Sequence, residues 1–494
     1  MSGRPAVVAL LVGAAGLMLE VLWIRVAGFA MQGLPGMFAV ILAMYLLGVA
    51  LGARLGRRLC HGQADAIRRR GAWVLLLSGV VDLAALALFA RQVGTVPPML
   101  LLMPLVLLTA VPKSALFPVV HHLGSNDTLR WKGTSFSKVY FFNVLGCTLG
   151  PLLVTLWGMD VLATEQLFLA VALTTWMAAL VLTPRGREQG ALVTMLVLGL
   201  AVLPSQLPPV MRTVAEATAK RPVDWLIERK EGVIHTVADA DGTVVYGGNV
   251  YDGRINTDLR RNSNRIDRVY AVMAAHPHPQ RVLVVGMSGG SWTRVITGFP
   301  VTRVDVVEIH PGYRELVARH AEVAPLLDDR RVQLHIGDGR QWLARHAGQY
   351  DVIVVNSTFH WRSGVTALLS REFMALLQAG LRPGGVALLN ATGSPDVLRT
   401  ATDVFAHAWL YGNTVLMSDT DFRPTLRDGR ARLLATVRDG QAVFDEADAD
   451  DNAAIAAVVE TALVDVDSVD RQTGRVSEVI TDWNMLSEYR HASR

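Results

Sequence analysis

The sequence predicts a polytopic α-helical membrane domain fused to an α/β Rossmann-like domain with a small β unit. Hydrophobic residues make up 51% of the chain, charged residues only 18%, and the apolar ones crowd into the first two hundred positions. Short strands and helices then alternate from 282 to 390, which demands a largely parallel sheet covered on both faces. We expect a membrane domain at 1–208, a small β unit at 209–278, a Rossmann-like domain at 279–440, and a C-terminal helix and tail at 441–494.

The membrane domain is predicted from seven apolar segments, most of them long enough to cross a core of ~30 Å, which needs about 20 residues. They lie near 5–29, 36–56, 72–91, 97–120, 139–158, 164–183 and 190–208. More spans follow the first segment, so it is expected to remain in the chain rather than act as a cleaved signal. Within the spans, Glu20, Arg25 and Lys113 should pair or face an internal cavity. Gly146 and Gly150 predict close helix packing.

The orientation in the membrane is predicted from basic loops at 54–70, 130–138 and 185–187. Such loops favour the cytoplasmic side, which places the amino terminus inside. The apolar core of the 190–208 segment, Ala191 to Pro204, would cover only ~21 Å as a helix, less than the hydrocarbon layer. We therefore expect this segment to lie in or dip into the inner leaflet. The membrane domain would then have six true crossings, and the soluble domain would be cytoplasmic.

Cysteine usage and net charge exclude several classes of function. The only cysteines are Cys60 in a basic loop and Cys147 in a predicted span, so neither a disulfide framework nor a cysteine metal site is expected. The net charge of +4 is small for 494 residues, and arginines gather at 54–70. This pattern indicates a face against anionic lipid rather than a nucleic-acid site.

The stretch from Arg281 to Gly339 predicts a nucleoside pocket. A buried strand ends in glycines at 286, 289 and 290, which let the backbone approach a ligand. Glu308 ends the second strand, where an acid can accept both ribose hydroxyls, and Asp338 follows the third strand, where an acid suits an adenine ring. S-adenosylmethionine or a derivative is therefore favoured over NAD. The alternatives are that Gly286, Gly289 and Gly290 only form a tight turn and that Asp338 caps the helix that follows it.

The elements after the pocket predict the rest of the sheet and one more helix. Segments near 223–258 alternate like short antiparallel strands. The segments Val415–Met417 and Arg432–Val437 are expected to close the large sheet as a hairpin, and 452–463 is expected to form an amphipathic helix.

These motifs resemble, in their order, the spermidine synthase (polyamine aminopropyltransferase) family. The shared motifs are the glycine loop, Val-Glu-Ile-His-Pro at 307–311, Gly-Asp-Gly at 337–339, Tyr-Asp-Val-Ile-Val-Val at 350–355 and Leu-Arg-Pro-Gly-Gly at 381–385. The membrane part is similar to the multispan segment fused to such domains in many bacterial proteins. The resemblance implies a bacterial inner-membrane protein that binds S-adenosylmethionine or decarboxylated S-adenosylmethionine. It adds Ser288, Gly339 and Asn356 to the expected cofactor contacts.

The departures from the family concern the amine site. Family members carry an acid in the glycine loop, where this chain has Gly289, and two acids after the fourth strand, where it has Asn356-Ser-Thr-Phe359. Asn264 and Arg265 stand near the position of a family tyrosine–histidine pair. A cationic polyamine would keep its desolvation cost here and lose its charge partners. Ordinary spermidine synthesis is therefore not expected.

The segment Phe359-His360-Trp361-Arg362 takes the place of those acids. Loops at the carboxyl ends of parallel strands build the active site of such sheets, so we assign candidate catalytic roles to Asn356, His360 and Arg362. His360 would act as a base, Arg362 would bind a carboxylate or phosphate, and Trp361 would cover a cation. The alternative is a loop packed by Phe359 and Trp361, with solvated His360 and Arg362.

Three functions remain open at this point. The first is a membrane-anchored transferase acting on a small-molecule or lipid acceptor other than a plain polyamine. The second is a genuine polyamine aminopropyltransferase with a rebuilt amine site, and the third is a non-catalytic nucleoside-binding or assembly module. The expected partners are the lipid bilayer, the acceptor and a second copy of the chain in a homodimer, whereas no nucleic acid and no metal are expected.

Overall fold

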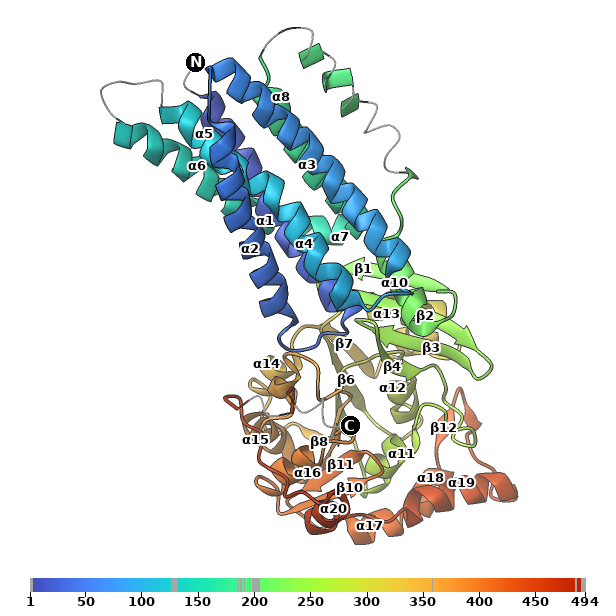
Figure 1. The fold of residues 1–494 in the computed structure, drawn as a ribbon. Helices are drawn as coiled ribbons and strands as arrows, with labels where there is room; N and C mark the ends of the chain where they lie inside the picture. Colours follow the sequence, from blue (N-terminus) through green and yellow to red (C-terminus); the bar gives the residue numbers. More distant parts are fainter. Residues whose placement is uncertain are drawn as a thin grey trace. The chain divides into compact units, whose positions relative to one another are not determined.

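A computed structural model describes residues 3–125, 132–184, 186, 189–190, 192–194, 196–197, 205–357, 359–484 and 487–489 (Figure 1). The chain divides into two compact units, Met1–Val233 and Ile234–Arg494. The first unit is mostly helical and the second is built around β-sheets.

The first unit consists of long apolar helices followed by a short helix and one strand. The elements are α1 (Arg4–Ala30), α2 (Met37–Leu59), α3 (Ala64–Gln92), α4 (Pro98–Ser114), α5 (Leu116–Ser125), α6 (Lys132–Leu153), a π-helical turn (Val154–Gly158), α7 (Met159–Val161), α8 (Thr164–Leu182), α10 (Val210–Ala219) and β1 (Trp225–Arg229). Among the described residues, six helical spans are long and apolar enough to cross a membrane, the last ending at Leu182. Six of the seven expected segments therefore form such helices. The seventh, 190–208, falls partly outside the described residues.

Glycines allow α1 and α6 to pack with their backbones in contact. A Cβ atom added to Gly150 would stand 2.6 Å from the carbonyl oxygen of Ala14, and one added to Gly146 would overlap the carbonyl oxygen of Leu10. Atoms do not approach so closely, so any side chain here would push the helices apart. The close packing expected at Gly146 and Gly150 is confirmed.

Two of the three charged side chains that were expected to pair within the spans, Arg25 and Lys113, are paired, whereas pairing of Glu20 stays a prediction. Lys113 of α4 forms an ion pair with Asp82 of α3, and its Nζ donates to Ser78 Oγ at 3.1 Å. Arg25 of α1 lies 3.6 Å from the Glu228 carboxylate of β1 and donates to Thr164 Oγ1 at 3.2 Å. The pairing expected for Arg25 and Lys113 is confirmed. Neither partner acid was singled out in the sequence.

The described residues on either side of 190–208 both pack against α3. Leu182, where α8 ends, packs beside Gly71 near the start of α3. Ala217 of α10 packs beside Gly94, just beyond the end of α3 at Gln92. The described residues Leu182 and Ala217 therefore lie near opposite ends of α3. The expected position of 190–208 at one membrane face stays a prediction, because much of this stretch lies outside the described residues.

Topology reporters fused after Thr183 and after residue 494 of the full chain decide whether this stretch crosses the membrane. A stretch that lies in or dips into one leaflet, as the short apolar run from Ala191 to Pro204 predicts, should give the same side of the membrane for both fusions. Paired phosphatase and fluorescent-protein fusions measure this, and a fusion after Gly62, between α2 and α3, should match the one after Thr183. Opposite read-outs after Thr183 and after residue 494 would contradict the expected six crossings.

The second unit contains a small antiparallel sheet and a large mixed sheet. The small sheet includes β2 (Gly232–Asp239), which begins at the unit boundary, β3 (Gly242–Gly247) and β4 (Val250–Arg254). The large sheet has the order β10-β11-β9-β8-β5-β6-β7. Its strands are β5 (Arg281–Val285), β6 (Arg303–Glu308), β7 (Val332–Ile336), β8 (Tyr350–Val355), β9 (Leu381–Asn390), β10 (His407–Tyr411) and β11 (Thr414–Ser418). The strands from β9 to β7 pair in parallel, while β10 and β11 run antiparallel.

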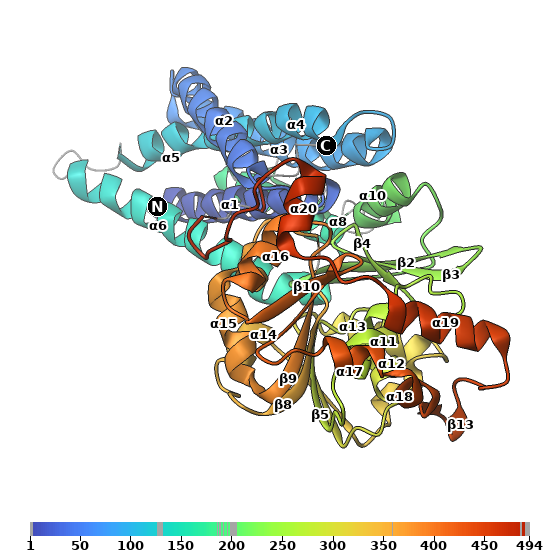
Figure 2. The ribbon, with the colours of Figure 1, turned by 90° about the horizontal axis from the view of Figure 1, so that it is seen from below.

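Helices cover both faces of the large sheet, as expected for a Rossmann-like fold (Figure 2). They are α11 (Asp267–Ala274), α12 (Ser291–Ile296), α13 (Gly312–Arg319), α14 (Gly339–Leu343), α15 (Arg371–Gly380) and α16 (Pro395–Thr402). Figure 2 shows α14, α15 and α16 on one side of the sheet and α11, α12 and α13 on the other. Every residue of β8 is buried, which explains its unbroken apolar sequence.

One of the strands expected beyond residue 400 is a helix in the structure. Val415–Met417 lies in β11 as predicted, but β11 pairs with β10 and β9. The expected second strand is instead α18 (Arg430–Leu434), preceded by α17 (Arg423–Arg427) and followed by the short strands β12 (Val437–Arg438) and β13 (Gln441–Ala442). The helix expected at 452–463 is confirmed as α19 (Ala449–Glu460), and α20 (Val466–Thr473) follows it.

Candidate functional site

The glycine loop lies at the carboxyl end of β5, against the loop that follows β8. Gly286 has a φ of +87°, and a Cβ atom on it would stand 2.7 Å from the carbonyl oxygen of Asn356. The Asn356 backbone N–H donates to the Val285 carbonyl at 2.9 Å, which holds the two loops together. Gly290, with a φ of +81°, precedes the first residue of α12. The positive φ values explain glycine at 286 and 290, and the loop brings its backbone to the edge of the sheet where parallel sheets bind ligands.

Glu308 ends β6 and turns its carboxylate toward this loop. The side chain is 3% exposed, Oε2 accepts from the Met287 backbone N–H at 2.7 Å, and Oε1 accepts from the His310 backbone N–H at 2.8 Å. Burial raises the pKa of Glu308 to about 7, although these two N–H groups oppose the shift. The structure therefore brings together Glu308 and the glycine loop, as predicted. Buried acids with shifted pKa values are typical of functional sites.

Asp338 follows β7 and is exposed. Its Oδ1 accepts from the Gln341 backbone N–H at 2.9 Å, so it caps the amino end of α14. The helix-capping role that was the alternative for Asp338 is confirmed, and contact of Asp338 with an adenine ring stays a prediction. A Cβ atom on the neighbouring Gly339 would overlap the Val285 side chain, so this glycine is needed for α14 to pack on β5.

The segment after β8 is folded against its surroundings rather than solvated. The rings of Phe359 and Trp361 stack at 5.8 Å between centroids, and Trp361 is 8% exposed. The backbone N–H and Nδ1 of His360 both lie 3.0 Å from Thr392 Oγ1. Thr392 therefore orients the imidazole, while Trp361 packs into the fold. Thr358 lies outside the described residues.

Arg362 points away from solvent toward the turn between β3 and β4. Its Nη1 donates to the Gly247 carbonyl at 3.3 Å. Burial lowers the pKa of Arg362, and the nearby Asp252 carboxylate opposes that shift. The solvated arginine of the alternative interpretation is therefore wrong. The Arg362 guanidinium therefore lies next to the β3–β4 turn of the small sheet.

Asp252 of β4 is a member of the site that sequence reasoning missed. Its Oδ2 accepts from the Tyr313 hydroxyl at 2.5 Å, and its carbonyl accepts from Ser288 Oγ at 2.9 Å. Burial raises the pKa of Asp252, and Arg362 and these hydroxyls oppose the shift. Glu308 is also close enough to interact with Asp252 electrostatically. The available signal was an acid between an aromatic residue and a glycine in a short strand, at Tyr251-Asp-Gly253.

Asn264 and Arg265, which stand near the position of the family tyrosine–histidine pair, follow the small sheet in sequence. The Asn264 side-chain oxygen accepts from the Arg254 backbone N–H at 2.9 Å. Arg265 has a φ of +51°, a conformation that few residues other than glycine adopt. Asn264 therefore stabilises the end of β4.

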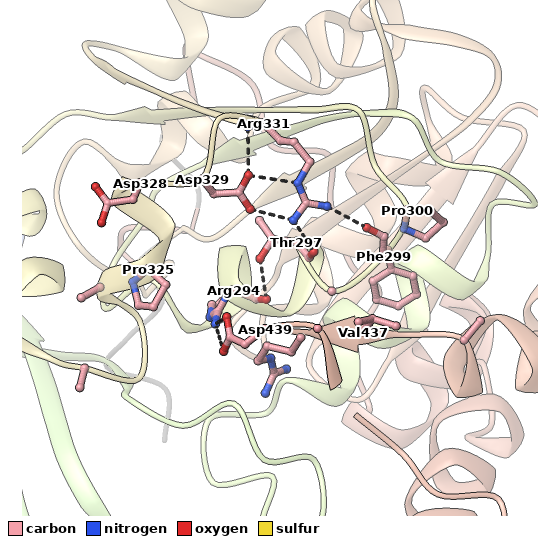
Figure 3. A pocket seen from close by; sticks show the side chains of 16 residues that line it. Arg294, Thr297, Phe299, Pro300, Pro325, Asp328, Asp329, Arg331, Val437 and Asp439 are labelled. Atoms are coloured by element: carbon pink, nitrogen blue, oxygen red, sulfur yellow. Dashed lines mark hydrogen bonds and ion pairs between the residues drawn. The ribbon is translucent and has the colours of Figure 1, made fainter. Parts of the chain in front are cut away.

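A separate cavity of about 770 Å³ is shown in Figure 3. It is lined by residues that follow or end α12, by the turn near Pro325 and by the β12–β13 hairpin. Arg331 is bound to Asp329 and to the Thr297 carbonyl, and Arg294 is paired with Asp439. Neither Glu308 nor the glycine loop lines this cavity, so the candidate nucleoside site is distinct from it. Across the described residues, no group of three or more His, Cys, Asp or Glu side chains is arranged to hold a metal ion.

Comparison with known proteins assigns a family to this region. Residues 269–401 match the Spermine/spermidine synthase domain. The chain is 33% identical over 159 residues to polyamine aminopropyltransferase 2 of Pseudomonas aeruginosa, which covers 30% of this chain and 46% of that protein. It is 30% identical over 162 residues to the polyamine aminopropyltransferase of Bacillus mycoides, which covers 31% and 57%.

Among solved structures, the spermidine synthase from Thermotoga maritima is similar with a TM-score of 0.36 and 16% identity, covering 41% of this chain and 75% of that one. The chain thus spans about half the length of the curated relatives it matches. The part of the chain that includes β5 to β9 is a spermidine synthase domain, and it is joined to an amino-terminal part with six apolar helices of membrane-spanning length.

Proposed function

We propose that this protein is a membrane-anchored, spermidine-synthase-like transferase that uses S-adenosylmethionine or its decarboxylated form on an acceptor other than a plain polyamine. The proposal rests on one contrast. The residues expected to bind the adenosyl donor are retained, whereas those expected to bind the amine acceptor are replaced. Glu308 and the glycine loop keep their positions, whereas Gly289 and Asn356 replace family acids.

The donor would bind across the glycine loop. The Glu308 carboxylate would accept hydroxyls of the ribose, and the backbone at Gly286 and Ser288 would approach the nucleoside. In the transfer, a nucleophilic atom of the acceptor attacks the carbon bound to the sulfonium. The carbon–sulfur bond breaks, its electron pair stays on sulfur as a thioether, and the proton of the acceptor goes to a base. His360, oriented by Thr392, is the candidate base.

The acceptor side is apolar where the family places an acid. A Cβ atom on Gly289 would stand 3.2 Å from Val245 Cγ2 and 3.3 Å from Ile255 Cγ1. A carboxylate at 289 would therefore press against two aliphatic side chains and lose its hydration. This supports an acceptor that does not need an acid at this position, such as a neutral or anionic small molecule or a lipid.

The proposal is tested by measuring methylthioadenosine release from decarboxylated S-adenosylmethionine with putrescine. We expect the rate to be at or near background, because the amine-binding acids are absent. A relative with polyamine aminopropyltransferase activity serves as the positive control. A rate comparable to that control would replace this proposal with a genuine aminopropyltransferase.

A second candidate is a nucleoside-binding module that transfers nothing. The observation that favours it is that Leu182 and Ala217, on either side of 190–208, lie near opposite ends of α3, with basic residues at 54–70, 130–138 and 185–187 before that stretch. Such residues favour the cytoplasmic side, and adenosyl donors are made in the cytoplasm. Reporter fusions after residue 494 separate the candidates, because a cytoplasmic carboxyl terminus supports the transferase and an exported one supports the binding module.

A further inference from the structure

A cation of the protein itself lies near a half-buried acid of the candidate site, Asp252. The Arg362 guanidinium donates to the Gly247 carbonyl, and the Asp252 carboxylate opposes the lowering of the Arg362 pKa by burial. Asp252 in turn binds the Tyr313 hydroxyl at 2.5 Å and reaches the glycine loop through Ser288. Asp252 and Glu308 are neighbouring acids, so Arg362 supplies the positive charge between the small sheet and the donor loop.

The turn between β3 and β4 is shaped to receive these two side chains. A Cβ atom on Gly248 would overlap Nη2 of Arg362, and one on Gly247 would stand 2.5 Å from the Tyr313 hydroxyl. Gly248 also has a φ of +61°, which glycine adopts readily. Two consecutive glycines therefore leave room for a guanidinium and a hydroxyl next to Asp252. Arg362 is seated in a position built for a cationic group.

We propose that Arg362 is a built-in cation that occupies the cation-binding position beside Asp252 and thereby excludes cationic amines from the acceptor site. A site that binds a free amine needs an accessible carboxylate, and here the Arg362 guanidinium already lies at the turn beside Asp252. Arg362 would thus set selectivity, a role different from the carboxylate or phosphate clamp that its sequence position suggested. The effect of Arg362 on acceptor choice rests on the proposed transferase function, whereas the location of Arg362 beside Asp252 does not.

Removing the guanidinium should create a measurable binding site for small cations. We expect the purified full-length Arg362→Ala protein to bind methylguanidine and putrescine at least ~10-fold more tightly than the unaltered protein, the range of one charge-assisted hydrogen bond. Isothermal calorimetry without any nucleoside measures this, so its outcome is independent of catalysis. Adding Asp252→Asn to Arg362→Ala should abolish the gained binding, because it removes the negative partner.

Three further variants keep the test decisive. Arg362→Met retains the aliphatic stem and tests the same gain if Arg362→Ala does not fold. Gly248→Ala should give a weaker gain, since it displaces the guanidinium without deleting it. Arg261→Ala removes an arginine whose side chain is 76% exposed and should behave like the unaltered protein. The proposal is overturned if folded Arg362→Ala and Arg362→Met bind neither cation more tightly than the unaltered protein, or if Arg261→Ala gives the same gain.

Discussion

Replacing Lys113 with methionine should destabilise the helical unit by about 3–5 kcal/mol, the usual cost of removing one member of a buried ion pair. The Lys113 and Asp82 side chains are 3% and 0% exposed, so the variant leaves a carboxylate buried without its cation. Among the described residues, Asp82 Oδ1 already has no hydrogen-bond partner. Ser78, whose Oγ accepts from the Lys113 ammonium, would lose that donor too.

The expected loss is measured by thermal unfolding of the detergent-purified protein. The double variant Asp82→Asn with Lys113→Met removes both charges and should be more stable than Lys113→Met alone. Arg68→Met is a matched control, because its partner Asp65 is 67% exposed, and exposed pairs contribute at most about 1 kcal/mol. Equal unfolding temperatures for Lys113→Met and the unaltered protein would contradict the buried pair.

The contribution of Glu308 to the stability of the second unit should fall by about 2–3 kcal/mol between pH 5 and pH 8, measured as the difference between the unaltered protein and Glu308→Gln. Its pKa is raised from the ordinary 4.5 to about 7 in the folded chain. A group with a raised folded pKa favours folding at low pH, and that contribution is lost as the pH rises through 7. The magnitude follows from ~1.4 kcal/mol per pKa unit.

Chemical unfolding of the ligand-free protein at several pH values checks this. Burial lowers the pKa of His235 to about 4 and also lowers the pKa of His276, so these two groups contribute a stability that rises with pH and opposes the Glu308 slope. The Glu308 contribution is therefore read from the difference between the unaltered protein and Glu308→Gln, and Glu315→Gln on the exposed side of α13 should behave like the unaltered protein. The same pH dependence of the free energy of unfolding in Glu308→Gln and in the unaltered protein would contradict the raised pKa of Glu308.

The fold was predictable where residue pattern alone decides the structure. The buried strands β5, β6 and β8 are continuous apolar runs, and such runs between helices leave few alternatives. The course of 190–208 stays a prediction, because hydrophobic length says nothing of where the chain resumes. Arg430–Leu434 was mispredicted because a short apolar run between arginines fits a strand and a helix equally well.

The site was predictable only for residues that follow strands in sequence. Glu308 and the glycine loop met because parallel strands end at one edge of the sheet. Asp252 and Tyr313 were missed because the small sheet reaches that edge through tertiary packing, which no local pattern encodes. Arg362 was located correctly, but its direction depends on two glycines more than a hundred residues away.

The central claim is that Glu308 and the glycine loop form an adenosyl-nucleoside site. It is tested most directly by calorimetric titration of the purified full-length protein with methylthioadenosine, S-adenosylmethionine and decarboxylated S-adenosylmethionine at pH 8 and pH 6. We predict micromolar binding of at least one of them at pH 8, weaker by about tenfold at pH 6, because an ionised carboxylate accepts the ribose hydroxyls and Glu308 titrates near 7. Glu308→Gln should bind weakly and equally at both pH values. No heat with any of the three nucleosides, or undiminished binding by Glu308→Gln, would contradict the claim.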